Sequence, residues 1–395
     1  MGPEFQPDGV VRPRPGDEDL RETWIVPPGA ENHASFLHRT ADGGIAVVWF
    51  AGSAEGRPDA YIHLARLSSD GSRWSEGKRV SSDDDRSEQN PVLATLPDGM
   101  LWLLYTAQDF GAQDTAQVLR RTSADGGAMW TDPEPLLPDR GLFIRQDLVV
   151  LDATTWLLPV FRCRTLPGRQ WRGDTDISSV LRTQDAGRTW IEVPVPDSEG
   201  LVHMDIVPQE NGPLLAFFRS RWADHVYRSE STDAGASWTA PVTLALPNNN
   251  SSIQVRAAVA ADGTPALLAV ANAVGAPAGS HLGDLPVILE DGKLTAPGDA
   301  QPLARHAVWG QPRLPLDLLV SADRGLTWQR VVRLESEDTL APELLAGSTA
   351  RDRELSYPAL VVDDTGDVHV SYTYGRRAIK YVRVPAPRWQ EQLGG

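Results

Sequence analysis

The sequence has only one cysteine, Cys163, among its 395 residues. A single cysteine excludes a disulfide within the chain and any metal site built from several thiolates. Hydrophobic runs are also short, because no stretch approaches the roughly 18 to 20 apolar residues that a membrane span needs. The opening MGPEFQPDGVV lacks the basic and then apolar pattern of a secretory signal. We therefore expect no membrane segment, no metal and no cofactor, and the compartment stays open.

Basic residues are in deficit as well. The chain has 37 Lys and Arg against 53 Asp and Glu, for a net charge of -16. Such a charge repels nucleic acid and anionic membrane surfaces, so we expect neither as a partner. The 31 prolines and 34 glycines are spread along the chain instead of being gathered in a linker. This distribution is typical of many short strands joined by tight turns.

What the sequence does contain is a repeated motif, Ser/Thr-x-Asp-x-Gly-x-x-Trp. Its Asp can accept hydrogen bonds from turn amides, its Gly can adopt a positive φ, and its Trp supplies a large apolar side chain at a sheet edge. Each copy lies between two β-type runs, which predicts a hairpin. The copies are STDAGASW from Ser231, SADGGAMW from Ser123, TQDAGRTW from Thr183, SADRGLTW from Ser321 and the shorter SSDGSRW from Ser68.

A second hairpin precedes the motifs, with turns such as PDGM at Pro97. Two hairpins make a four-stranded unit, and the spacing of the motifs is close to the length of one propeller blade with its loops. A sixth unit, SYPALVVDDTGDVHVSYTY followed by AIKYVRV, has no such motif. We therefore predict an all-β, six-bladed β-propeller. The segment ETWIVPP is expected to close the last sheet as its outer strand, which removes exposed edges.

The propeller is expected to form one domain over residues 21–388, because each repeat buries the next. A long insertion rich in Gly, Pro and Ala interrupts it at about 275–311. Residues 1–20 are expected to be a flexible segment or a remnant of cloning, and residues 389–395 a C-terminal tail. We expect the protein to be a monomer.

Five copies of the motif, known as the Asp-box, on a six-bladed pattern resemble the sialidase (neuraminidase) superfamily over nearly the whole chain. The Asp-boxes lie on the outer hairpins, away from the axis, so they indicate the fold and not the function. In a propeller the innermost strand of each blade begins at the central pocket. Functional residues are therefore expected where the six units open, at Asn32-His33, Gln89-Asn90, Arg145 to Asp147, His203 to Asp205, Asn250 to Gln254 and Tyr357.

The resemblance also implies roles for single residues. Sialidases bind an acid sugar with three arginines, attack it with a tyrosine that a glutamate activates, and use an aspartate as acid and base. Tyr357 looks like the nucleophile, because the family opens its last blade with a similar Tyr-Ser stretch. Arg219 and Arg313 are similar to the second and third arginines. These matches imply a glycan pocket that binds a carboxylate.

The chain departs from the family at two positions. Sixteen residues before Arg219, where the family has its activating glutamate, stands His203. Where the family begins its first blade with Arg-Ile-Pro, this chain has His33-Ala-Ser. The acid/base aspartate has no clean counterpart, and the candidates are Glu55 and Asp59. Because histidine titrates near neutral pH, these departures favour proton transfer by imidazole.

The expected site therefore has two groups of residues. The catalytic candidates are Tyr357, His203, His33, Asp59 and Glu55. The candidates for substrate binding lie on the same strands and their rims, and they are Arg219, Arg313, Arg145, Gln146, Arg221, Asn250, Gln254 and Tyr374.

These residue types favour an enzyme that acts on a glycan. The first interpretation is a sialidase-like exo-glycosidase that hydrolyses a terminal acidic or deoxy sugar, with His203 activating Tyr357. The alternative is a polysaccharide lyase or rhamnosidase-type enzyme acting on a rhamnose-glucuronate linkage, in which an arginine neutralises the carboxylate and His or Tyr takes the α-proton. That alternative resembles propeller-fold lyases in residue type only. The third interpretation is a propeller that binds glycans without catalysis.

Overall fold

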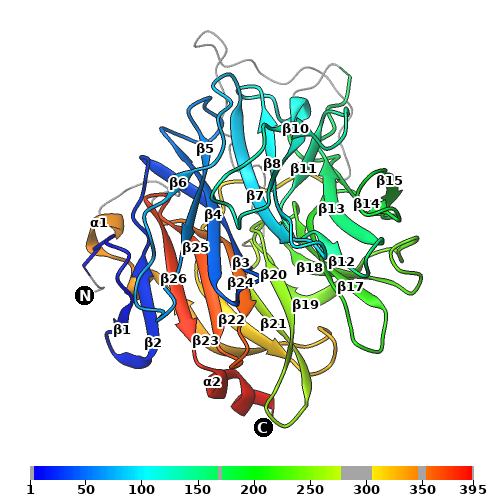
Figure 1. Cartoon of the computed structure of the whole chain (residues 1–395). Helices are drawn as coiled ribbons and strands as arrows, with labels where there is room; N and C mark the ends of the chain where they lie inside the picture. Colours follow the sequence, from blue (N-terminus) through cyan, green and yellow to red (C-terminus); the bar gives the residue numbers. More distant parts are fainter. Residues whose placement is uncertain (1–3, 168–170, 277–304, 346–352, 394–395) are drawn as a thin grey trace.

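The computed structural model describes residues 4–167, 171–276, 305–345 and 353–393. In these residues the strands form six sheets, arranged as blades around a common axis (Figure 1). The prediction of an all-β, six-bladed propeller is therefore confirmed. The middle strands of the first two blades read as nearly continuous apolar runs, IAVVWFAG and LWLLYTAQ, because neighbouring blades cover both of their faces.

The first three blades follow the chain in order. The first contains β3 (Glu31–Arg39), β4 (Ile45–Gly52), β5 (Tyr61–Arg66) and β6 (Lys78–Arg79). The second contains β7 (Ser87–Thr95), β8 (Leu101–Gln108), β9 (Gln117–Ser123) and β10 (Glu134–Pro135), with the 3-10 helix η1 (Gln113–Thr115). The third contains β11 (Leu142–Ile144), β12 (Val149–Val150), β13 (Trp156–Arg162), β14 (Ile177–Thr183) and β15 (Ile191–Pro194).

The other three blades complete the ring. The fourth contains β16 (Leu201–Val207), β17 (Leu214–Ser220), β18 (His225–Ser231) and β19 (Val242–Pro247). The fifth contains β20 (Gln254–Val259), β21 (Pro265–Ala271), β22 (Leu316–Ser321) and β23 (Gln329–Glu335), followed by η2 (Glu337–Thr339) and α1 (Pro342–Leu345). The sixth contains β24 (Leu355–Val362), β25 (Val368–Tyr374), β26 (Ala378–Val384), β2 (Asp17–Trp24) and β1 (Arg12–Arg14).

The N-terminal strands close the ring. β2 pairs with β26 with Thr23 opposite Tyr381, so the expected closure by ETWIVPP is present, and β1 adds a further strand outside it (Figure 1). A buried ionic cluster holds this junction, in which Lys380 Nζ lies 3.1 Å from Glu22 and also pairs with Glu335. The expectation of a flexible segment over residues 1–20 is therefore wrong from β1 onward, because these residues gain strand pairing and buried charge pairs.

The two remaining boundaries also differ from expectation. The tail expected at 389–395 begins inside α2 (Ala386–Gln390) and continues as η3 (Glu391–Leu393). Trp389 is fully buried there and donates a hydrogen bond to the Gly366 carbonyl at 2.9 Å, so this segment is part of the domain. Of the insertion expected at about 275–311, residues 277–304 lie outside the described part.

The Asp-boxes join neighbouring blades. Gly235 has a φ of +76°, and a Cβ on it would lie 2.7 Å from Leu157 of the preceding blade. Gly325 has the same relation to Phe217, at 2.6 Å. Glycine is required at these positions both for the backbone conformation and for the close approach. In these two copies the motif therefore fixes its own turn and also packs its outer hairpin against the preceding blade.

Candidate active site

Four of the inner strands contain the same β-bulge near the axis. In β3, β7, β16 and β24, two residues oppose one residue of the adjacent strand. The first residue of each bulge has a positive φ, between +49° and +56°. This conformation is costly for residues other than glycine and is concentrated at functional sites. The four residues are Ala34, Asn90, His203 and Tyr357.

Tyr357 lies at the centre of a group of arginines. Its hydroxyl accepts a hydrogen bond from Arg219 Nη1 at 3.0 Å. The guanidinium carbons of Arg145, Arg219 and Arg313 lie 5.4, 5.6 and 5.4 Å from the centre of its ring. Burial alone would raise the pKa of Tyr357, but the charges of Arg219 and Arg313 lower it below its ordinary value. The phenol of Tyr357 therefore loses its proton more readily than an ordinary tyrosine does.

Two imidazoles flank the phenol. The ring centres of His33 and His203 lie 4.3 and 5.4 Å from that of Tyr357. Burial, followed by the charge of Arg376, lowers the pKa of His33 to about 3. Burial and the charge of Arg219 hold the pKa of His203 well below its ordinary value. Both rings are therefore neutral at physiological pH, and the burial and positive charge that keep them neutral also make them weak bases in this structure.

Each imidazole has a ring nitrogen that makes no hydrogen bond among the described residues. His33 Nδ1 lies 2.8 Å from Thr373 Oγ1, whereas its Nε2 makes no hydrogen bond and lies 3.8 Å from Glu354 Oε1. His203 Nδ1 also makes none. Buried polar atoms in proteins nearly always have partners, so two free nitrogens beside one phenol indicate a place for a ligand or a transferred proton.

The carboxylates near the phenol are already paired. Glu354 accepts from Arg313 and from Arg376 Nε, the latter at 2.6 Å. Glu55 accepts from Arg376 Nη1, also at 2.6 Å. Burial would raise the pKa of Glu55, but the charge of Arg376 lowers it to about 2. Such a group is ionised at neutral pH, so Glu55 does not carry a proton to donate as a general acid.

Two guanidiniums have no carboxylate partner among the described residues. Arg219 is fully buried, donates from Nε to Asn250 Oδ1 at 2.8 Å, and has an unpartnered Nη2. Arg145 is 1 % exposed and donates only to backbone carbonyls. Burial lowers the pKa of Arg219 to about 9 and that of Arg145 to about 10. Both remain charged at pH 7, so the cluster around Tyr357 has buried positive charge that an anion would neutralise.

A second wall of the site surrounds Arg221. Its Nη2 lies 2.8 Å from Asp176, which also accepts from Trp171 Nε1 at 2.9 Å. The guanidinium carbon of Arg221 lies 4.7 Å from the ring centre of Trp309. Trp309 stands at the described end of the insertion, whose Val308 amide donates to the Arg221 carbonyl at 2.7 Å. The insertion therefore contributes to this wall.

Several expected substrate residues have other roles. Gln146 Nε2 donates to the Ile253 carbonyl at 2.6 Å, and Gln254 Nε2 donates to Gln146 Oε1 at 3.0 Å. Because both glutamines are fully buried and committed in this way, they join blades across the axis. Tyr374 is also fully buried, in the core beside Trp24, and its hydroxyl accepts from the Ala341 amide at 2.8 Å. It does not face the phenol.

Asp59 lies apart from the cluster as well. It is exposed, and its carboxylate accepts from Ser53 Oγ at 2.9 Å. The structure thus brings together Tyr357, His33, His203, Arg145, Arg219 and Arg313, with Glu55, Asn250 and Arg221 at the border.

Sequence reasoning missed Glu354, Arg376 and Trp309. Glu354 stands three residues before Tyr357, in the stretch ELSY, and its position was a usable signal. Arg376 is on the turn between β25 and β26 and pairs with residues hundreds of positions away, so no local pattern marked it.

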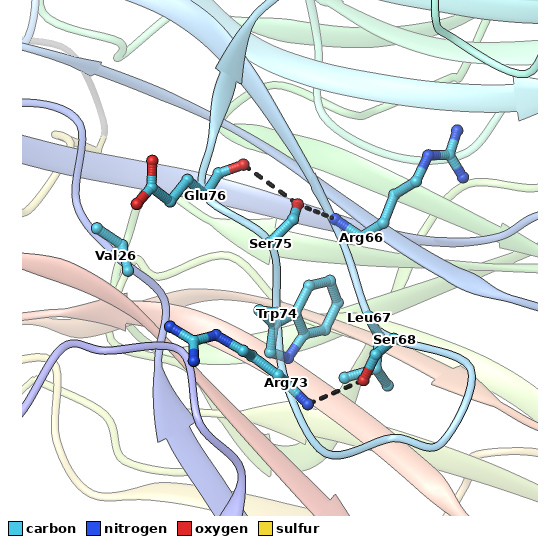
Figure 2. Close-up of a pocket in the computed structure, with 8 residues that line it drawn as sticks. All are labelled: Val26, Arg66, Leu67, Ser68, Arg73, Trp74, Ser75 and Glu76. Atoms are coloured by element: carbon cyan, nitrogen blue, oxygen red, sulfur yellow. Dashed lines mark hydrogen bonds between the residues drawn. The ribbon is translucent and has the colours of Figure 1, made fainter.

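A separate hollow of about 500 Å³ lies at the outer hairpin of the first blade. It is lined by Val26, Arg66 to Ser68 and Arg73 to Glu76, and it shares no residue with the Tyr357 cluster. Figure 2 shows Ser75 bridging the Arg66 amide and the Glu76 carbonyl, with the Arg66 side chain directed away from the hollow. We assign it no chemical role.

No group of three or more His, Cys, Asp or Glu in the part of the chain that the structure describes is placed to hold a metal ion. None of the helices described there is long and apolar enough to cross a membrane.

Solved structures similar to this fold include several sialidases. A Hadza microbial sialidase matches with a TM-score of 0.66 and 14% identity, over 91% of this chain and 66% of its own. The NanB sialidase of Streptococcus pneumoniae matches with a TM-score of 0.67 and 10% identity, over 98% and 72%. A Dyadobacter fermentans protein of unknown function matches with a TM-score of 0.66 and 16% identity, over 93% and 99%.

At such identities these matches show a shared fold alone, and this chain spans only 66% of the Hadza sialidase. A search of curated proteins finds no match. The model of the BNR repeat-like domain matches residues 43–370, which is most of the propeller. The chain therefore belongs to the BNR repeat-like domain family, and its fold is the sialidase-like six-bladed propeller.

Proposed function

We propose that the protein is an exo-acting glycoside hydrolase that removes a terminal acidic sugar from a glycan. The observation that carries this proposal is the buried guanidinium of Arg219, which donates a hydrogen bond to the Tyr357 hydroxyl and has no carboxylate partner among the described residues. A carboxylate on the sugar would supply the missing negative charge and accept hydrogen bonds from the free Arg219 Nη2.

The reaction that fits these residues has two displacements. The sugar carboxylate bound at Arg219 offsets part of the positive charge that lowers the pKa of His203. This imidazole then takes the phenolic proton of Tyr357 while the phenolate oxygen attacks the anomeric carbon. The bond from that carbon to the leaving oxygen breaks, and the imidazolium returns the proton to this oxygen. Water then attacks the anomeric carbon while the bond from that carbon to the Tyr357 oxygen breaks. The same imidazole takes a proton from this water and returns it to the phenolate oxygen. The free sugar and the intact phenol result.

A β-eliminating lyase is the second candidate, and one observation favours it. Glu354 and Glu55 are both held by Arg376, whereas each imidazole is neutral and has a ring nitrogen that makes no hydrogen bond among the described residues. Elimination at a uronate needs a cation on the carboxylate and a base for the α-proton, and Arg219 with Tyr357 or His203 would supply them. The rhamnose-glucuronate linkage is the substrate considered for this chemistry.

Product analysis on unmodified glycans separates the candidates. Sialyl, glucuronyl and rhamnosyl glycosides are incubated with the protein, and products are identified by mass. Hydrolysis adds the elements of water, whereas elimination does not and leaves an unsaturated uronate that absorbs in the near ultraviolet. If no glycoside is cleaved and a sugar still raises the melting temperature, the protein is a glycan-binding propeller and both enzymatic proposals are wrong.

A further inference from the structure

Arg145 has an unusual set of partners. It lies between β11 and β12 in the third blade, and its Nη2 donates to the carbonyls of Ser35 at 2.9 Å, Tyr357 at 3.0 Å and Pro358 at 3.1 Å. Tyr357 and Pro358 are the two residues of the bulge in β24, and Ser35 is the second residue of the bulge in β3. One guanidinium nitrogen therefore crosses the axis and contacts two of the four bulges.

The bulges that it contacts are strained. Tyr357 has a φ of +50° and Ala34, which precedes Ser35, has a φ of +56°. A conformation of this kind persists only where the surroundings enforce it. Because a bulge leaves ladder groups without strand partners, its carbonyls need another donor. Arg145 is the side chain that supplies this donor to both bulges.

The positive charge of Arg145 is buried without a carboxylate partner among the described residues. This residue is 1 % exposed, its Nε and Nη1 have no partner among the described residues, and its guanidinium carbon lies 5.4 Å from the centre of the Tyr357 ring. A neutral side chain could donate a hydrogen bond to carbonyls at lower cost than a buried cation. The free-energy cost of burying this cation has a purpose if its charge stabilises the phenolate form of Tyr357.

We propose that Arg145 is a positioning residue that clamps the bulges of β3 and β24, directs the Tyr357 phenol into the pocket and favours its phenolate, without binding the substrate. This inference rests on the proposed function for its kinetic part only. The effect on the phenol exists whether or not a substrate is known.

Direct titration of Tyr357 tests the proposal without any substrate. Tyrosinate absorption is measured against pH for the wild type and for Arg145→Met, each minus the matching variant that also carries Tyr357→Phe. Loss of a cation at this distance is expected to raise the midpoint of Tyr357 by about one pH unit. Arg145→Lys keeps a charge and is expected to restore most of the shift. An unchanged midpoint in Arg145→Met overturns the proposal.

Arg256 offers a matched control, because it is another partly buried arginine at the axis. It pairs with Asp147 and with Asp205, and makes no contact with the bulge carbonyls. Arg256→Met is expected to leave the Tyr357 midpoint in place. A shift as large as that of Arg145→Met would mean that any axial arginine has this effect, and would overturn the specific role of Arg145.

Kinetics on the glycan identified by the product screen give a second readout. A positioning residue is expected to lower kcat by about tenfold or more with KM nearly unchanged, and Arg145→Lys is expected to recover part of kcat. A variant with raised KM and unchanged kcat would make Arg145 a substrate ligand and overturn the proposal. If no glycan is turned over, the proposed function fails, while the titration still decides the role of Arg145.

Discussion

The cluster around Tyr357 and the outer hairpins differ in how fully their polar groups are hydrogen-bonded. In the fourth Asp-box along the chain, Asp233 accepts from the Ser237 amide at 2.9 Å and from the hydroxyls of Ser237 and Ser231 at 2.6 and 2.8 Å. In the Tyr357 cluster, the buried atoms His33 Nε2, His203 Nδ1 and Arg219 Nη2 make no hydrogen bond among the described residues. The hairpin therefore satisfies its own polar groups, whereas the Tyr357 cluster leaves several buried polar atoms without a hydrogen bond.

Their backbones differ in the same sense. Both regions use positive φ angles, but the hairpin uses glycine at Gly235, where that conformation is free of steric cost. The pocket uses Tyr357 and His203, for which it is strained. The Asp-boxes are therefore expected to stabilise the fold, whereas the strained and unsatisfied residues around Tyr357 are expected to lower its free energy of unfolding.

The largest effect is expected at the phenol. Tyr357→Phe keeps the ring contacts and removes the hydroxyl, so turnover should fall by about a thousandfold with little change in melting temperature. Initial rates on the identified glycan and a thermal melt measure both quantities. Activity within tenfold of the wild type would remove Tyr357 from the chemistry.

The next largest effect is expected in the hairpins, on stability alone. Gly235→Ala combines a positive φ with a Cβ 2.7 Å from Leu157, and should cost about 2 to 4 kcal/mol in the free energy of unfolding. Gly263 has a φ of +86° and open space around it, so Gly263→Ala isolates the conformational cost and should lose less. Urea unfolding measures the pair. Equal losses would show that contact between blades does not matter.

A pocket substitution should have the opposite sign. Arg219→Met removes a fully buried cation that has no carboxylate partner among the described residues, so the free energy of unfolding should stay level or rise by about 1 to 2 kcal/mol. Binding of an acidic sugar should be lost in the same variant. A clear loss of stability would contradict the view that this charge is held for function.

The smallest effect is expected in the pH dependence of stability. Burial and the charge of Arg219 lower the pKa of His203. Below about pH 6.5 the unfolded chain therefore binds a proton at His203 that the folded chain does not bind. Stability is therefore present above that pH and falls as the pH decreases. Because the pKa of His33 is lowered in the same direction, His203→Gln should reduce this slope without abolishing it, by at most about 1.4 kcal/mol for each pH unit. Urea unfolding at pH 7.5 and 5.5 compares the variants, and parallel losses would contradict the assignment.

The sequence was sufficient for features that are local or repeated. The Asp-boxes are predictable because each turn is satisfied by residues of the same motif, as with Asp233 and Ser231. Their spacing then predicts the blades. Placing His203 and Tyr357 near one another required the resemblance to the sialidases, because 154 residues separate them and only the closed ring brings their rings to 5.4 Å.

The sequence was not sufficient for the direction and the partners of side chains. Tyr374 ends the stretch SYTY, which contains a Ser-Tyr pair like the one at Tyr357. It nevertheless lies in the regular part of β25 and packs into the core. Arg145 and Gln146 stand at a blade opening, yet they bond to the backbone of other blades. The sequence offers Glu55 as a candidate acid, but in the structure its carboxylate pairs with Arg376, which lies 321 residues away in the sequence.

The closure of the ring by β2 affects the order in which the protein can be completed. β1 and β2 are translated long before β26, the strand through which they join the sixth blade. That blade also carries Tyr357, so the sheet that holds the proposed nucleophile is completed last. A nascent chain interrupted before this point would hold five finished blades and no assembled site.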